Sequence, residues 1–240
     1  MSKTIGEQIT LEQLAQNPYP LFQQMLAHEP VCWVPAFKMW MVTRREDVIE
    51  ILRDAETYTM EPEGGQINPM EDTFGRMMLS IDGPEHKKIR DLFSEPFRAR
   101  PVRHNYRHVI AQIATQLVDE IAQQEVVDLD KAFADNLAIY TVVAALGLDV
   151  NDVGQFREWY DDFAAALGNM TFDGEIRRRG RETYAKFSQL VLTQLEKLRE
   201  PHNESVLSHV VHHNVQQLSG EEIVSNVALT FFGGVETATA

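Results

Sequence analysis

The chain has 240 residues, of which 44% are hydrophobic and 24% are charged. This composition is that of an ordinary globular protein, and it excludes a collagen-like, low-complexity or largely disordered chain. The formal net charge of −14 disfavours wholesale binding to nucleic acid or to an anionic membrane, and the single cysteine, Cys32, excludes an internal disulfide and a multi-cysteine metal framework within these residues.

The first 60 residues predict short elements around a β-hairpin. Residues 18–28 predict a helix with a proline at its start. Short strands are predicted at residues 31–34 and 39–42, on either side of a turn, and a short amphipathic helix at residues 45–52. Residues 61–72 contain two glycines and two prolines and predict a long irregular loop, a class that usually forms a lid or stays disordered.

From residue 82 onward the apolar periodicity is helical almost throughout. Asp82 and Glu85 have the spacing of a capping box for a helix that ends at Ser94, before Pro96. Three more helices are predicted from apolar stripes or runs, at residues 110–121, at residues 137–148 and around residues 184–198. No signal peptide or membrane span is predicted, since the run at 137–148 is too short to cross a bilayer; the chain is therefore expected to be cytoplasmic, with no membrane partner.

A last helix is predicted from a second capping box, formed by Ser219 and Glu222, and it is still running at Ala240. The stretch from Val227 to Phe232 is apolar on several faces, as in a central helix surrounded by protein. Since a central helix needs neighbours on every side, we expect the 240 residues to be the front part of a larger domain.

Two groups of residues are candidates for chemistry. His86 and Arg90, at i and i+4, project from one helix face and are able to donate hydrogen bonds to two carboxylates. The spacing alone, however, favours the interpretation that they belong to a solvated, charged helix surface. The segment from Gly233 to Thr237 (GGVET) places two glycines in an apolar helix, which indicates either a helix end or a group that approaches the backbone closely, with Glu236 and Thr237 able to pass protons to it.

Two further patterns have simpler interpretations. His209 and His213 are also spaced i, i+4, but no third metal ligand is evident, and residues 203–214 predict an exposed polar helix. Residues 86–108 carry seven lysines and arginines against two acidic residues. This basic segment is either a docking face for an acidic partner or a solvated helix surface, and the second is commoner.

The two candidate motifs resemble those of a known family. The segment from Met78 to Arg90 (MLSIDGPEHKKIR), with Pro96 to Arg100 (PFRAR), closely resembles the C-helix region of bacterial cytochromes P-450. The GGVET segment resembles that family's oxygen-binding I-helix motif, usually Ala/Gly-Gly-x-Asp/Glu-Thr. The elements between the motifs occur in the family's order, so the resemblance spans essentially the whole chain.

The resemblance implies a mainly α fold with a small β-sheet element, in which residues 1–240 are the N-terminal part of a single domain: a small β element and lid within 1–80, and a helical region at 82–240. It implies a haem-thiolate monooxygenase that inserts one oxygen atom from O2 into a hydrophobic small molecule. The implied cofactor is haem b, and the electrons of NAD(P)H would arrive through an acidic ferredoxin or flavodoxin with its reductase.

Site residues also follow from the resemblance. His86 and Arg90 would bind the haem propionates, and Gly233 and Gly234 would let haem and dioxygen approach the helix. Two sets are less specific guesses. The substrate would be lined by Phe74, Phe163, Leu167 and Phe172, and the redox partner would face Lys87, Lys88, Arg103 and Arg107.

Glu236 and Thr237 would relay protons for cleavage of the O–O bond, and here the sequence departs from the family. Ala238 stands where a second hydroxyl is usual, so the relay rests more heavily on Thr237. The family's later Glu-x-x-Arg helix and cysteine loop are absent, and Cys32 does not match the axial position, so the axial cysteine is expected beyond Ala240.

Two alternative functions stay open at this stage. The chain is also compatible with a haem-free helical binding or interaction protein that is a remnant of the same scaffold. A haem protein that performs peroxide-driven or isomerising chemistry is a further alternative, although the acid and alcohol at Glu236 and Thr237 favour oxygen activation.

Overall fold

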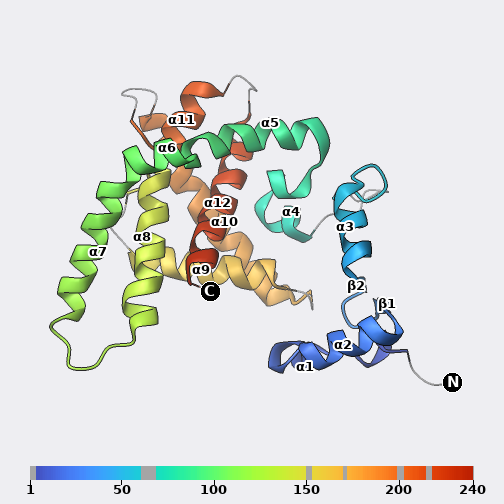
Figure 1. Ribbon diagram of the computed structural model, residues 1–240. Helices are drawn as coiled ribbons and strands as arrows, with labels where there is room; N and C mark the ends of the chain where they lie inside the picture. Colours follow the sequence, from blue (N-terminus) through green and yellow to red (C-terminus); the bar gives the residue numbers. More distant parts are fainter. Residues whose placement is uncertain are drawn as a thin grey trace. The chain divides into compact units, whose positions relative to one another are not determined.

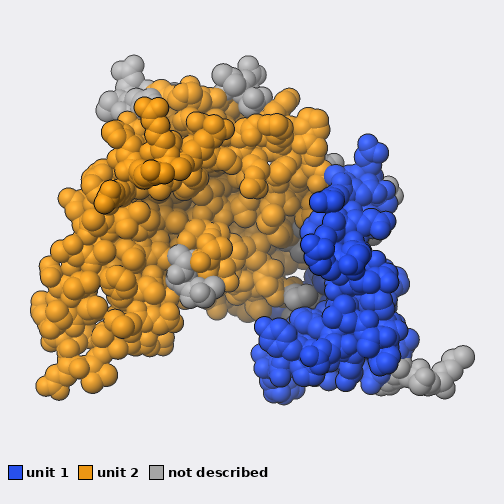
Figure 2. Space-filling view, in the orientation of Figure 1, with its two compact units in different colours: residues 1–59, 170–173 blue, residues 60–169, 174–240 orange. Residues whose placement is uncertain are grey.

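The computed structural model describes residues 4–60, 69–149, 153–169, 172–198, 203–214 and 218–239. These residues are mainly helical, with one two-stranded antiparallel sheet, as predicted (Figure 1). The chain divides into two compact units, coloured separately in Figure 2: residues 1–59 with 170–173 form unit 1, and residues 60–169 with 174–240 form unit 2. None of the described helices is both long enough and apolar enough to cross a membrane.

Unit 1 is organised around the predicted hairpin. Its elements are η1 (Gly6–Gln8), α1 (Leu11–Gln16), α2 (Tyr19–His28), β1 (Val31–Val34), β2 (Met39–Val42) and α3 (Arg45–Arg53). The antiparallel register places Trp33 opposite Trp40, with their rings packed edge to face. A small core contains Ile9, Met25, Cys32, Val34 and Phe37. Cys32 is 1% exposed in this core, and its burial, together with the charge of Glu29, raises the pKa of its thiol.

Unit 2 is built from helices. The first are α4 (Pro69–Phe74), η3 (Met78–Ser80), α5 (Gly83–Ser94), η4 (Glu95–Phe97), α6 (Ala99–Pro101) and the π-helical η5 (Val102–Tyr106). Then follow α7 (Arg107–Ile121), the π-helical η6 (Asp130–Ala134), α8 (Asp135–Leu146), α9 (Val153–Leu167), α10 (Gly174–Lys197), α11 (Val206–His213) and α12 (Gly220–Thr239). The predicted helices of this unit are therefore confirmed, with boundaries that differ by a few residues.

Two local predictions for unit 2 are wrong. The predicted loop at residues 61–72 ends earlier, because residues 69–72 belong to α4; residues 61–68 lie outside the described part of the chain. Helix α11 is not an exposed polar helix, since it buries Val206, Leu207 and Val210. Its apolar side chains share one face, which packs into the core of unit 2, while the histidines lie on the rest of the surface.

Helix α12 lies at the centre of unit 2, where it packs against α8, α9 and α10 (Figure 1). As predicted, its apolar stretch is buried: Val227, Ala228 and Phe231 are at most 1% exposed. The Phe231 ring lies 5.6 Å from the ring of Phe187, between centroids, and 5.8 Å from that of Phe156. This aromatic core fixes the position of the last turns of α12, where the candidate motif lies.

Asp72 of α4 attaches this short helix to α10. Its carboxylate forms ion pairs with Arg177 and Arg181, and the Arg181 guanidinium also donates to the backbone carbonyl of Asp72 at 3.1 Å. The hydrogen bond from Arg177 is the main cause that lowers the pKa of the Asp72 carboxyl; Arg181 adds to the lowering, while burial opposes it.

We expect Asp72→Asn to lower the melting temperature at neutral pH and to lose this effect in acid. Because the folded-state pKa is depressed, the stabilisation is fully present above the unfolded-state pKa of about 4 and is lost as the pH falls through the folded-state pKa. Melting curves of both proteins between neutral and strongly acidic pH measure the difference. The control is Glu182→Gln, which removes an exposed ion pair with Arg178 and is expected to leave the melting temperature unchanged. A difference for Asp72→Asn that persists in strong acid contradicts the prediction.

Candidate active site

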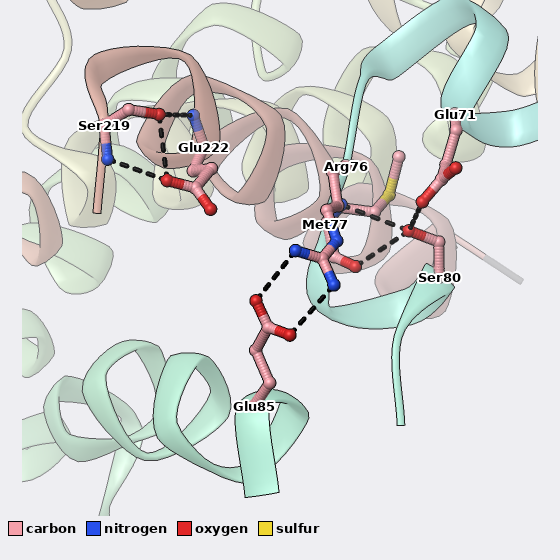
Figure 3. A network of polar contacts seen from close by, with 7 residues as sticks. All are labelled: Glu71, Arg76, Met77, Ser80, Glu85, Ser219 and Glu222. Atoms are coloured by element: carbon pink, nitrogen blue, oxygen red, sulfur yellow. Dashed lines mark hydrogen bonds and ion pairs between the residues drawn. The ribbon is translucent and has the colours of Figure 1, made fainter. Parts of the chain in front are cut away.

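Helix α12 begins at the predicted capping box and continues through both glycines of the GGVET segment. The Ser219 N–H donates to the Glu222 carboxylate at 2.8 Å, and the Glu222 N–H donates to the Ser219 hydroxyl at 3.2 Å (Figure 3). Since α12 extends to Thr239, Gly233 and Gly234 lie inside the helix, and the interpretation of these glycines as a helix end is wrong.

The two adjacent glycines have different surroundings. A Cβ atom on Gly234 would lie 2.3 Å from Cγ2 of Val142 in α8, a distance that real side chains do not adopt. Gly234 is therefore required by the close packing of α12 against α8. A Cβ atom on Gly233 would meet nothing within 4 Å, so the packing of the described residues does not explain why glycine stands there. Gly233 is the position at which a further group has room to approach the helix.

Glu236 and Thr237 lie beside Gly233 on α12. They follow it by three and four residues, a spacing that places all three on neighbouring parts of one helix face. The Thr237 hydroxyl donates to the Gly233 carbonyl at 2.9 Å, whereas the Glu236 carboxylate accepts a hydrogen bond from the Tyr160 hydroxyl of α9. Both side chains are exposed, so an acid and an alcohol flank the open position at Gly233.

His86 and Arg90 lie one turn apart on one face of α5, as predicted. His86 is half-buried and Arg90 is exposed. Within the part of the chain that the structure describes, neither side chain forms a hydrogen bond or an ion pair. Two donors on one helix face are thus available to a ligand that carries carboxylates.

The capping box predicted at Asp82 and Glu85 is wrong, although α5 begins where the box predicted it. The Asp82 side chain does not cap the helix; its carboxylate accepts the Met60 N–H at 2.6 Å. Glu85 instead binds the Arg76 guanidinium through two hydrogen bonds of 2.8 and 2.9 Å (Figure 3). Both carboxylates are thus used by residues that lie earlier in the chain, and they attach the preceding segment to the start of α5.

That preceding segment is also attached to α12. Asn226 is fully buried, and its side-chain carbonyl accepts the Met78 N–H at 2.8 Å. The Ser80 hydroxyl donates to the Glu71 carboxylate at 2.6 Å and accepts the Met77 N–H at 3.2 Å (Figure 3). These contacts hold the entry to α5, which carries His86 and Arg90, in a fixed relation to α4 and α12.

The four predicted substrate-lining residues do not lie in one kind of environment. Phe74 and Phe163 are buried and pack edge to face in the core of unit 2, with ring centroids 5.0 Å apart, and Leu167 is half-buried at the edge of that core. Phe172 belongs to unit 1, where it is 53% exposed and lies under the Lys38 ammonium group. The role of all four in substrate binding stays a prediction.

The four residues predicted to face a redox partner are exposed on unit 2. Lys87 forms an ion pair with Asp91 on α5. Lys88, Arg103 and Arg107 form no ion pair within the described residues. The basic segment, residues 86–108, therefore presents mostly positive charges that form no ion pair within the described residues, and an acidic surface is able to neutralise them.

The histidines of α11 do not form a metal centre. The rings of His209 and His213 are stacked, with centroids 4.2 Å apart. Among the described residues, no group of three or more histidine, cysteine, aspartate or glutamate side chains is arranged to hold a metal ion.

Sequence reasoning missed two residues of the site, Tyr160 and Val142. Both belong to helices whose apolar pattern predicts only core packing, and no local signal shows that they contact the GGVET segment. Asn226 was also missed, but it had a signal: a lone amide within an apolar helix requires a buried hydrogen-bond partner.

Known proteins are similar to the chain over nearly its whole length. No family model matches the chain. The polyketide biosynthesis cytochrome P450 PksS of Bacillus subtilis (strain 168) is 26% identical over 238 residues, which cover 92% of this chain and 57% of that protein. The crystal structure of CalO2 matches 96% of this chain and 58% of its own, with 25% identity and a TM-score of 0.76. The structure of P450BioI in complex with an acyl carrier protein ligated to hexadec-9Z-enoic acid covers 96% of this chain and 60% of its own, with 23% identity and a TM-score of 0.79.

The fold and the similar proteins point to the same class of protein. The described residues have the helical fold, with a small sheet, that is found in the corresponding part of the cytochromes P450. The chain is similar over nearly its whole length to proteins named cytochromes P450, and it spans 57 to 60% of the length of the three relatives named above.

Proposed function

We propose that the complete protein is a haem-thiolate monooxygenase, which inserts one oxygen atom from O2 into a hydrophobic small molecule with electrons from an external partner. The observation that carries this proposal is the open position at Gly233, flanked by an acid and an alcohol, in a chain related to the cytochromes P450 over nearly its whole length. Residues 1–240 would be part of a single cytoplasmic domain.

The residues present fit a haem. The free side chains of His86 and Arg90 would bind its propionates, and the space at Gly233 would admit it beside α12. When bound, haem b supplies a redox-active iron that activates dioxygen. The axial thiolate would come from a cysteine outside residues 1–240, because Cys32 is buried in the core of unit 1. The role of Gly234 in admitting the haem stays a prediction, and its packing against Val142 is a separate reason for a glycine at that position.

Glu236 and Thr237 would handle the protons. The Thr237 hydroxyl is held one turn from Gly233 through its hydrogen bond to the Gly233 carbonyl, which leaves its oxygen free to accept a further hydrogen bond. The exposed Glu236 carboxylate is able to take protons from solvent and pass them along this face of the helix. Proton transfer by this pair is the chemistry that the chain's own residues would contribute.

The propionate assignment makes a specific prediction. We expect the His86→Ala/Arg90→Ala double variant to bind haem about tenfold more weakly or worse, because charge-assisted hydrogen bonds to the carboxylates are lost. Haem titration followed by the Soret absorbance measures the affinity. Lys88→Ala, which removes another exposed cation from α5, is the matched control and is expected to bind haem normally. Melting curves without haem should be the same for all three proteins.

If the double variant binds haem as well as Lys88→Ala does, the propionate assignment is wrong. The wider proposal is tested by the carbon-monoxide difference spectrum of the reduced, haem-loaded protein. A thiolate-type Soret band supports the monooxygenase. The haem-free interaction protein is supported if the complete open reading frame encodes no cysteine loop and the protein binds no haem.

The partner that supplies electrons would be a ferredoxin or flavodoxin, with its reductase and NAD(P)H as the source. Its acidic surface would dock on the basic segment that includes Lys88, Arg103 and Arg107. Stopped-flow reduction of an Arg103→Glu/Arg107→Glu variant at several salt concentrations tests this docking face, and an unchanged rate and salt dependence would remove it.

A further inference from the structure

Tyr160 of α9 makes two contacts with α12, one through its ring and one through its hydroxyl group. The ring stacks on Phe232, with centroids 5.9 Å apart and planes 18° from parallel. The hydroxyl donates to the Glu236 carboxylate. Phe232 and Glu236 are one helical turn apart, so the Tyr160 side chain lies along α12 and its hydroxyl reaches the turn that follows Gly233.

The acid and the alcohol of the site are therefore held in different ways. The Thr237 hydroxyl bonds to a carbonyl of its own helix, so its direction is fixed within α12. The Glu236 carboxylate bonds to a hydroxyl on another helix, so its direction depends on where α9 lies. Helix α9 is in turn attached to α10, because Asp162 forms an ion pair with Arg179 and accepts a hydrogen bond from Thr183 at 2.6 Å.

We propose that Tyr160 is a positioning residue for Glu236, which sets the direction of the carboxylate beside Gly233. This inference rests on the proposed function of Glu236 as a proton carrier. The Tyr160 hydroxyl holds one oxygen of the Glu236 carboxylate on the α9 side. A displacement of α9 changes this direction, so that proton delivery depends on the position of α9.

A second tyrosine provides a matched control. The Tyr184 hydroxyl of α10 hydrogen-bonds to the Ser225 hydroxyl of α12 at 2.9 Å, eleven residues before Glu236. Tyr184→Phe and Tyr160→Phe each remove one hydroxyl that ties a neighbouring helix to α12, and each keeps the aromatic ring. If the Tyr160 bond only ties two helices together, the two variants will behave alike.

The first measurement needs no haem. The carboxylate stretching bands of Glu236 are found in the full chain as the infrared difference between the natural protein and Glu236→Gln. We expect Tyr160→Phe to shift these bands, because one hydrogen bond to the carboxylate is lost, and we expect Tyr184→Phe to leave them in place. Unshifted bands in Tyr160→Phe overturn the proposal.

The second measurement uses the haem-loaded protein, with NADPH, a plant-type ferredoxin and its reductase as the electron source. Dioxygen consumption is measured in H2O and in D2O. We expect Glu236→Gln to slow it about a hundredfold and Tyr160→Phe about tenfold, each with a larger solvent isotope effect, while Tyr184→Phe matches the natural protein.

The two proposals fail in different ways. If Glu236→Gln consumes dioxygen at the natural rate, Glu236 carries no protons, and both the relay and the role of Tyr160 are wrong. If Glu236→Gln is slow while Tyr160→Phe and Tyr184→Phe both match the natural protein, the relay is supported and the positioning role of Tyr160 alone is overturned.

Discussion

Replacing Phe231 by alanine is expected to lower the free energy of unfolding by about 3–5 kcal/mol, the usual range for a phenylalanine removed from a core. Phe231 is fully buried, and its ring lies within 6.3 Å of the rings of Phe156, Phe163 and Phe187, between centroids. These neighbours come from α9 and α10, so a cavity at Phe231 removes contacts among three helices at once. Edge-to-face packing of Phe163 on Phe231 adds to the loss.

Urea unfolding measures this effect, as a lower midpoint with an unchanged dependence on urea concentration. Phe97→Ala is the matched control, because it is the same substitution at a side chain that is 42% exposed. Phe97→Ala is expected to change stability by less than about 1 kcal/mol. An equal effect of the two substitutions would show that α12 is not held by the aromatic core.

Much of the fold could be predicted because its helices and its hairpin follow from local patterns. The apolar stripe of residues 110–121 and the apolar run of 137–148 correspond to α7 and α8, and the short strands pair in the predicted hairpin. These patterns reflect which faces of an element must be buried, and burial decides secondary structure over most of the chain.

The predictions that failed depended on contacts between residues distant in the sequence. The spacing of Asp82 and Glu85 is that of a capping box, but Gly83 adopts a φ of 65° and the two carboxylates bind Met60 and Arg76. The second box, at Ser219 and Glu222, forms as predicted. Spacing alone does not distinguish the two cases, because the competing partners of Asp82 and Glu85 come from elsewhere in the fold.

The sequence identified the residues of the candidate site but not their contacts with other helices. The sequence marks Gly233 and Gly234 as equally unusual, since both disfavour a helix. Only the position of Val142 on α8 shows that one glycine is needed for packing and that the other is not. The partner of Glu236, Tyr160, is likewise defined by the packing of α9 on α12.

This difference between the glycines predicts opposite effects of the same substitution. Gly234→Ala is expected to destabilise the protein by about 1–3 kcal/mol, because its Cβ atom would overlap Val142 and force α8 and α12 apart. Gly233→Ala is expected to stabilise the haem-free protein by up to about 1 kcal/mol, since alanine favours a helix and its Cβ atom would meet nothing. Urea unfolding of the haem-free proteins measures both values.

Two additional measurements separate packing from function. Val142→Ala should restore much of the stability lost in Gly234→Ala, because the overlapping methyl group is gone, and a double-mutant cycle measures this coupling. In the haem-loaded protein, Gly233→Ala should no longer be more stable than the natural protein. It should also bind haem more weakly, because its methyl group occupies the space through which the haem would approach α12. If Gly233→Ala binds haem as tightly as the natural protein, the open position at Gly233 is not where the cofactor approaches, and the proposal for this face of α12 is wrong.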